Sequence, residues 1–273
     1  MSDRRSDDWS KINGLRWGLF RPNRRTASDQ IPMLVRNNKR TFEFKGNKGV
    51  WIQNSKVDLT KRQFTLQLLL FYEDFNGETR DMPFIRPLLV FKAQPEGFDK
   101  NDKDWEGDVT KASGLSKEEL ESYDDRCDVA FSTKAWMGKQ VCEYDVQRIL
   151  EAIGDENILL QLDGYESYLN VLKKIDIDGH IREAVSPGDC TDLCSTIDQE
   201  LGSFVKTHFN NAFQTDFRKR PDAWQTGKVP AKERRKLFTI WTCDAVAALM
   251  QRPHIIRRAF RGTGGLGLSV RVY

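Results

Sequence analysis

The first half of the chain shows short apolar runs and alternating patterns that are typical of β-strands. Residues 41–53 alternate around a Gly-Asn-Lys-Gly turn and predict a hairpin. Residues 63–72 form a run that is apolar on both faces, and a further strand is expected within 129–137. Residues 83–91 form another apolar run, whose two prolines favour a position at the edge of a sheet. Together these runs predict a small, mostly antiparallel β-sheet.

The second half of the chain changes to a helical period. Residues 146–153 and 165–175 each place their apolar side chains on one helix face, and Gly154 is positioned to end the first helix. Longer apolar stripes over residues 193–213 and 237–249 predict the two longest helices.

The predicted fold class is therefore α+β, with a small, mostly antiparallel sheet in the N-terminal half, a helical C-terminal half and basic terminal arms. The chain divides into a basic arm at 1–30, a β-rich region at 31–138, an α-helical region at 139–258, and a Gly-rich hinge and C-terminal β tail at 259–273. Within the β-rich region, residues 96–128 hold 12 Asp/Glu against 5 Lys/Arg, which predicts an acidic loop with one helical turn at 116–122.

Length and composition limit the class of protein. A chain of 273 residues with 39% hydrophobic content can bury a sizeable core. Its longest apolar run near the centre, residues 66–72, is far shorter than the roughly 20 residues that span a bilayer, and its N-terminus has no apolar segment. These features predict an intracellular protein of the cytoplasm or nucleus, and five scattered cysteines predict reduced thiols.

Charge is distributed unevenly along the chain. Residues 1–50 carry a net charge of +7 and residues 201–273 a net charge of +10, whereas residues 51–200 carry −14. Basic terminal segments of this kind are a common means of meeting a polyanion. The alternative is that the basic ends and the acidic middle neutralise each other within one fold or between neighbouring copies.

The candidate nucleic-acid-binding residues belong to the basic clusters and to aromatic residues beside them. Lys and Arg neutralise backbone phosphates, and Trp17, Phe20, Trp224 and Phe260 could stack on unpaired bases. The alternative is that the cations offset helix dipoles and the aromatic residues are core, although a cluster at 232–236 opens a helix, where cations are disfavoured. The predicted binding residues are Arg16, Trp17, Phe20, Arg21, Arg24, Arg25, Arg218, Lys219, Arg220, Lys232, Arg234, Arg235, Lys236, Arg257, Arg258 and Arg261.

The arrangement of these clusters depends on how the two longest helices pack. If the helices are antiparallel, the clusters at 218–220 and 232–236 fall at the same end, and the one at 257–261 lies roughly 30 Å away. Such a spread favours an extended ligand over a compact one.

No catalytic or cofactor motif stands out, so no catalytic residue, metal site or cofactor is predicted. The glycine string at 262–267 lacks the Lys-Ser/Thr of a phosphate loop and follows a helix. Cys190 and Cys194 lie one helical turn apart without enough further ligands for zinc. Acidic pairs such as Asp124-Asp125 or Asp176 and Asp178 could hold magnesium in a nuclease, although an Asp-rich turn is the favoured explanation of residues 176–180.

The function that the sequence favours is a sequence-tolerant nucleic-acid-binding protein that self-assembles on its polymer, in the manner of a viral packaging or transport protein. Its predicted partners are single-stranded nucleic acid, with RNA favoured, and other copies of itself through the terminal arms. Two alternatives stay open: a matrix-like scaffold on an anionic membrane surface, and a metal-dependent nuclease.

Overall fold

The computed structural model describes residues 20, 22–35, 62–72, 84–99, 101–102, 105–186 and 195–263. Within these residues six strands form one sheet, in the order β4-β3-β2-β1-β5-β6. The strands are β1 (Arg25–Leu34), β2 (Arg62–Phe71), β3 (Leu88–Lys92), β4 (Asp128–Ser132), β5 (Ile158–Leu162) and β6 (Ile181–Val185). The predicted combination of a sheet followed by a helical C-terminal half is confirmed. The predicted hairpin at 41–53 and the β tail lie outside the described residues.

The sheet is not purely antiparallel. Strand β2 is antiparallel to β1 and β3, whereas β1 with β5, β5 with β6, and β3 with β4 are parallel pairs. The parallel strands need crossover connections, which α3 (Lys139–Ile153) and α4 (Glu166–Ile175) provide between β4 and β5 and between β5 and β6. Five strands therefore point the same way, and their carboxyl ends lie along one edge of the sheet.

Three sequence interpretations are corrected by the strand positions. Residues 25–30 were assigned to the basic arm but belong to β1, in the middle of the sheet. Strand β3 was expected at the edge of the sheet but lies between β4 and β2. This internal position is possible because its nearest proline, Pro87, precedes the strand and removes no ladder hydrogen bond. Strands β5 and β6 lie in the region predicted to be helical, although the wholly buried run of β5 is typical of a parallel strand.

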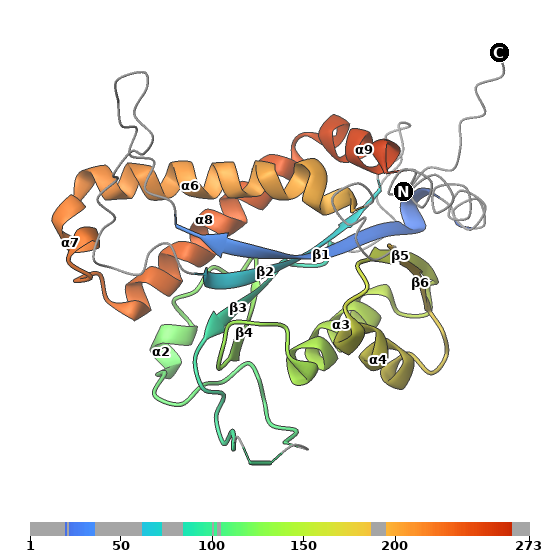
Figure 1. Cartoon of the computed structure of the whole chain (residues 1–273), viewed down its shortest axis with the longest axis horizontal. Helices are drawn as coiled ribbons and strands as arrows, with labels where there is room; N and C mark the ends of the chain where they lie inside the picture. Colours follow the sequence, from blue (N-terminus) through green and yellow to red (C-terminus); the bar gives the residue numbers. More distant parts are fainter. Residues whose placement is uncertain are drawn as a thin grey trace, which may run out of the picture.

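Helices cover both faces of the sheet (Figure 1). One face packs against α6 (Gly202–Lys219), α8 (Ala231–Met250) and α9 (Pro253–Gly262), and the other against α3 and α4. Strand β3 shows how the faces are shared, since Leu89 and Phe91 join the first core and Leu88 and Val90 the second. The shorter elements are η1 (Pro22–Arg24), α2 (Lys117–Leu120), η2 (Ile197–Leu201) and α7 (Pro221–Gln225).

Two glycines set the ends and spacing of helices. Gly154 ends α3 with a φ of 58°, as the sequence predicts. Gly202 begins α6, where an added Cβ would lie 3.2 Å from the carbonyl oxygen of Ile197 and 3.5 Å from Cδ1 of Ile31. Because it has no side chain, η2 and the start of α6 can lie directly against β1.

A buried ion-pair network fixes α3 against β4. The Arg148 guanidinium donates to Asp145 at 2.6 Å and to Asp128, and the Tyr168 hydroxyl donates to Asp145 at 2.8 Å. The Asp145 side chain is 1% exposed, so its charge depends on this arginine for compensation.

We predict that Arg148→Ala lowers the free energy of unfolding by about 3–5 kcal/mol, because it leaves the Asp145 carboxylate buried and unpaired. Arg86→Ala is the matched control, since the side chain of Arg86 is half exposed where it pairs with the same Asp128, and such a pair contributes about 0–1 kcal/mol. Urea unfolding of both variants measures the difference, and equal losses would contradict it.

Candidate active site

The N-terminal candidates that the structure describes are engaged within the protein. Arg25 is buried, and its guanidinium donates to the carbonyl oxygen of Phe20 at 3.0 and 2.9 Å. Arg24 pairs with Glu156 at 2.7 Å. Arg16, Trp17 and Arg21 lie outside the described residues.

The clusters at the ends of α6 and α8 divide into paired and unpaired cations. Arg220 pairs with Asp216 at 2.7 Å and with Glu233, which joins the end of α6 to the start of α8. Arg235 pairs with Glu119 at 2.6 Å. The exposed side chains of Arg218, Lys219, Lys232 and Lys236 make no ion pair with a described residue. Arg234 is half-buried, and burial together with the charge of Arg235 lowers its pKa.

The third cluster lies on α9, at the opposite end of α8 from α7 (Figure 1). Arg258 pairs with Glu200, Arg257 is half-buried and Arg261 is exposed. The prediction that Trp224 and Phe260 could stack on bases is wrong, because both are core residues, exposed by only 1% and 0%.

Part of the basic charge is neutralised by the acidic middle of the chain, residues 51–200, because Arg24, Arg235 and Arg258 pair with Glu156, Glu119 and Glu200. Between the candidate cations and the acidic loop at 96–128, the described residues contain one ion pair, that of Arg235 with Glu119. The remaining paired candidates use Glu156, Asp216, Glu233 and Glu200, outside the loop.

A group of carboxylates that the sequence analysis missed lies at the carboxyl edge of the sheet. Pairing between β1 and β5 ends where Ala27 is opposite Gln161, and each strand reaches an aspartate two residues later, Asp29 and Asp163. The two strands are parallel neighbours, so both aspartates emerge at the same edge, where α/β proteins commonly bind ligands.

The segment that enters η2 adds a third carboxylate. The Ser195 hydroxyl donates to Oδ2 of Asp29 at 2.8 Å and accepts the Asp198 N–H at 3.1 Å. Asp163 is half-buried, and its carboxylate accepts the N–H of Tyr165 at 3.2 Å. Asp198 is exposed to solvent. Ser195 thus links the two aspartates that come from distant parts of the chain.

Asp29 differs from the other buried carboxylates of the described residues. Three Asp or Glu side chains are buried there: Asp29, Glu119 and Asp145. Glu119 pairs with Arg235 and Asp145 with Arg148, but Asp29 has no Lys or Arg partner. Buried charges in proteins are normally paired or coordinate a metal ion.

The surroundings of Asp29 disfavour its charged form. Burial, followed by the negative charge of Asp198 and a weaker contribution from Asp163, raises the pKa of Asp29 to about 7, against the hydrogen bonds from Ser195 and Gln30. Burial and the charge of Asp198 likewise raise the pKa of Asp163, although the Tyr165 N–H opposes the shift. A cation at this edge would relieve both effects.

A buried polar network surrounds the carboxylates. Thr196 donates its hydroxyl to Oε1 of Gln161 at 2.5 Å, and its oxygen lies 2.7 Å from that of Thr263, the residue that follows α9. Ser186, which follows β6, is 3% exposed and its hydroxyl has no partner. Ser186, Ser195 and Thr196 line one small pocket beside Asp29.

Asp176 and Asp178, one of the acidic pairs that the sequence offered for magnesium, precede β6 and so lie at the other edge of the sheet. Both carboxylate oxygens of Asp176 accept backbone N–H groups, from His180 at 2.8 Å and from Ile181 at 2.7 Å. They therefore shape the turn before β6. Asp163, in contrast, could have been found from the sequence. An Asp-Gly pair directly follows the apolar run 158–162, a pattern typical of a buried strand that ends in a turn.

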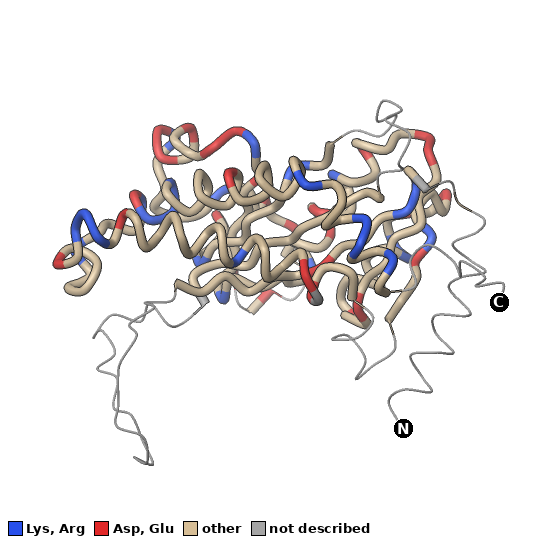
Figure 2. The backbone as a smooth tube through the Cα atoms, turned by 90° about the horizontal axis from the view of Figure 1, so that it is seen from above, with Lys and Arg blue, Asp and Glu red and all other residues tan. Residues whose placement is uncertain are grey.

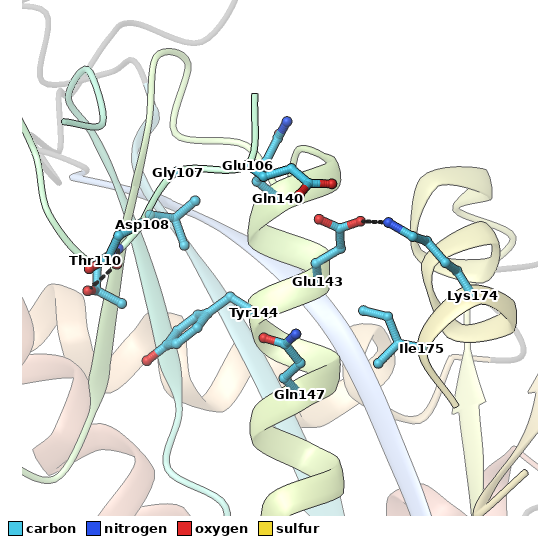
Figure 3. A pocket seen from close by; sticks show the side chains of 11 residues that line it. Glu106, Gly107, Asp108, Thr110, Gln140, Glu143, Tyr144, Gln147, Lys174 and Ile175 are labelled. Carbon is cyan, nitrogen blue, oxygen red and sulfur yellow. Dashed lines mark hydrogen bonds and ion pairs between the residues drawn. The ribbon is translucent and has the colours of Figure 1, made fainter. Parts of the chain in front are cut away.

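A second pocket, of about 490 Å³, lies between α3, α4 and the loop at 106–110 (Figure 3). Glu143 of α3 and Lys174 of α4 face each other there at 3.1 Å, and Asp108 accepts a hydrogen bond from the Thr110 hydroxyl and pairs with Lys111. These charges compensate each other, so this pocket makes a weaker candidate than the carboxylates at Asp29.

Three further observations apply only to the residues that the structure describes. No helix there has the length and apolar character needed to cross a membrane. No three His, Cys, Asp or Glu side chains are gathered closely enough to enclose one metal ion by themselves. Cys127, Cys142 and Cys243 are free and buried, whereas Cys190 and Cys194 lie outside this part of the chain.

Comparison with known proteins identifies no family. No protein-family model and no curated protein matches the sequence. Among solved structures, the chain is similar to the Mos1 transposase paired-end complex with left transposon end (TM-score 0.40, 9% identity) and to the Mos1 mariner paired end complex with Mn (TM-score 0.42, 9% identity). The alignments cover 96% and 98% of this chain but 61% and 63% of those chains. Likeness this low carries no argument about function.

We predict that Asp29→Asn stabilises the protein more at pH 7–8 than at pH 4–5. The folded-state pKa of Asp29 is about 7 against 3.8 for a free side chain, so the folded form holds an extra proton between these values and loses stability as the pH rises. The increase in the free energy of unfolding that Asn produces should therefore be larger at pH 7–8 than at pH 4–5, by up to about 4 kcal/mol, since each pKa unit corresponds to about 1.4 kcal/mol. Urea unfolding across this range measures it, with the exposed Asp178→Asn as control. A gain independent of pH would contradict the assignment.

Proposed function

We propose that this protein is a metal-dependent enzyme that cleaves or transfers phosphodiester bonds of nucleic acid, with Asp29 and Asp163 as its metal-binding carboxylates. The observation that carries the proposal is the buried Asp29 carboxylate, which has two further carboxylates near it and no cationic partner among the described residues.

The donor set fits a hard divalent cation. Mg²⁺ prefers oxygen ligands and is commonly held by one or two carboxylates together with waters and substrate phosphates. A complete protein cage is therefore not required for such an ion. When bound, such an ion polarises a phosphoryl oxygen and lowers the pKa of a coordinated water.

The protein's own residues hold and orient this site. Asp29 would bind the ion from within β1, two residues past its pairing with β5, and Asp163 from the residue that follows β5. Asp198, near the start of η2, adds negative charge beside them. The Ser195 hydroxyl and the Gln30 N–H, which donates at 2.6 Å, fix the orientation of the Asp29 carboxylate. The Tyr165 N–H does the same for Asp163.

A polyanionic substrate is favoured over a neutral one by the distribution of cations. At the end of α6 and the start of α8, four exposed cations make no ion pair with a described residue: Arg218, Lys219, Lys232 and Lys236. In a phosphodiester reaction, a new P–O bond forms to the attacking oxygen and the bond to the leaving oxygen breaks. The attacking water or hydroxyl loses its proton, and the leaving oxygen takes one up.

Self-assembly on a polymer, as in viral packaging or transport, stays a prediction from the sequence. It depends on the terminal segments 1–19 and 264–273, which lie outside the described residues. The same holds for a preference for single strands or for RNA. Membrane attachment as a matrix-like scaffold has no supporting observation in the described residues.

We predict that Mg²⁺ or Mn²⁺ raises the Tm of the wild-type protein at pH 8 by a few degrees. At about ten times its Kd the ion contributes about 1.4 kcal/mol, and 1 kcal/mol shifts the Tm of a chain of this size by about 2–4 °C. Asp29→Asn and Asp163→Asn should lose this shift, whereas Asp178→Asn, at the opposite edge, should keep it. A shift that survives in the first two variants would place the ion elsewhere.

We further predict that the protein cleaves labelled DNA or RNA oligonucleotides in the presence of Mg²⁺ or Mn²⁺ and not in EDTA. Asp163→Asn should lower the rate by at least about 100-fold, because metal stabilisation of the transition state contributes several kcal/mol and each 1.36 kcal/mol is tenfold in rate. Gel analysis against Asp178→Asn measures the effect. Equal rates for the two variants would contradict the proposed site.

A further inference from the structure

We propose that the end of the molecule at α7 is a docking surface for the phosphate backbone of nucleic acid, a partner assignment that rests on the proposed function. The surface, which we name the α7 patch, consists of Arg218, Lys219, Lys228, Lys232 and Lys236. Four of these residues are among the binding residues predicted from the sequence, and the fifth, Lys228, is added here.

The α7 patch is a local excess of unpaired charge. Residues 216–236 contain eight Lys/Arg and three Asp/Glu. Two of the three acids, Asp216 and Glu233, are already paired with Arg220. All five patch residues are exposed and make no ion pair with a described residue. The patch therefore keeps its positive charge available to an external anion.

The position of Lys232 argues against a purely local role for these cations. It lies in the first turn of α8, where the helix dipole disfavours positive charge. Lys232 is near Glu118 and helps to lower the pKa of that exposed carboxyl, after the hydrogen bond from Ser116, but the two do not form an ion pair. Lys236 follows one turn later on the same face of α8.

The fold keeps the patch together as one surface. The bridge from Arg220 to Asp216 and Glu233 holds the end of α6 against the start of α8, and the buried Trp224 anchors α7 by donating its indole N–H to Asp216 at 2.8 Å. Lys and Arg from the two helix ends therefore lie at one end of the molecule (Figure 2).

The distance between the α7 patch and the carboxylates at Asp29 is one that a long polymer can span. Between Asp198 and Lys219 the chain runs along η2 and α6 for about 20 residues, or about 30 Å at 1.5 Å per residue. One turn of duplex DNA rises about 34 Å. A duplex whose reacting phosphate lies at Asp29 would thus reach the α7 patch about one turn away.

Nucleic acid fits the patch better than an anionic membrane. The exposed large hydrophobic residues of the described chain are Phe84, Trp136 and Ile177, none of them within residues 216–236. Stable attachment to a membrane usually needs a hydrophobic anchor in addition to basic residues, whereas contacts to a phosphate backbone need only cations that displace counterions.

The test compares two triple variants of the full chain with the same change in charge. The patch variant is Lys219→Gln, Lys232→Gln, Lys236→Gln, and the control is Lys134→Gln, Lys139→Gln, Lys173→Gln, from the side of the sheet covered by α3 and α4. Binding of a 30-base-pair DNA duplex, a length chosen at about three helical turns, is measured in EDTA over a KCl series. Vesicles containing anionic lipid are the second probe.

The plot of log K against log salt concentration has a negative slope. We expect its magnitude to fall by about 0.9 for each lysine removed, or by about 2.7 in the patch variant, and to stay at the wild-type value in the control. An unchanged slope, an equal loss in the control, or a loss confined to vesicle binding would overturn the proposal. Because EDTA prevents cleavage, Asp163→Asn should keep the wild-type slope. Absence of cleavage by the wild-type protein would count against the proposed function alone.

Discussion

The parallel pairing of β1 with β5 is the constraint on which the rest of the site depends. Strand β2 satisfies one edge of β1 over its whole length, but β5 pairs only with Arg25–Ala27 on the other edge. Beyond that point the two strands are free to separate, and an aspartate follows on each. The backbone ladder thereby fixes both carboxylates at the same depth of the sheet without any direct bond between them.

The buried carboxylates of the described residues are stabilised in two different ways. Asp145 and Glu119 are buried with arginine partners, and these pairs join α3 to β4 and α8 to α2. Asp29 is buried with hydrogen-bond donors only, from Ser195 and Gln30. Donors of this kind orient a carboxylate but do not balance its charge, so burial and the charge of Asp198 raise the pKa of Asp29 to about 7.

Helices α3, α4, α6 and α8 and three of the strands could be predicted from the sequence because each carries its own period. Helix α9 was missed, and residues 259–262, which were interpreted as the start of a Gly-rich hinge, belong to it. The apolar stripes of α6 and α8, the cap at Gly154 and the run of β2 are local signals. The sheet order and the direction of β5 and β6 depend on long-range pairing, which no local period encodes. Asp29 was hidden for the same reason, since its neighbours Asp163 and Asp198 are more than 130 residues away in the chain. The sequence also could not tell which predicted cations are available to a ligand. Lys219 and Arg220 carry the same charge, but in the structure Lys219 is exposed whereas Arg220 is paired with Asp216.

The contact between Thr263 and Thr196 has a consequence for the architecture of the whole chain. The two hydroxyls meet in the interior next to Gln161, so the last residue of the described chain is anchored beside the strand that leads to Asp163. The end of α9 is thus joined through Thr196 to Gln161, next to the acidic edge of the sheet, although Thr263 and Asp163 are about a hundred residues apart in the primary structure.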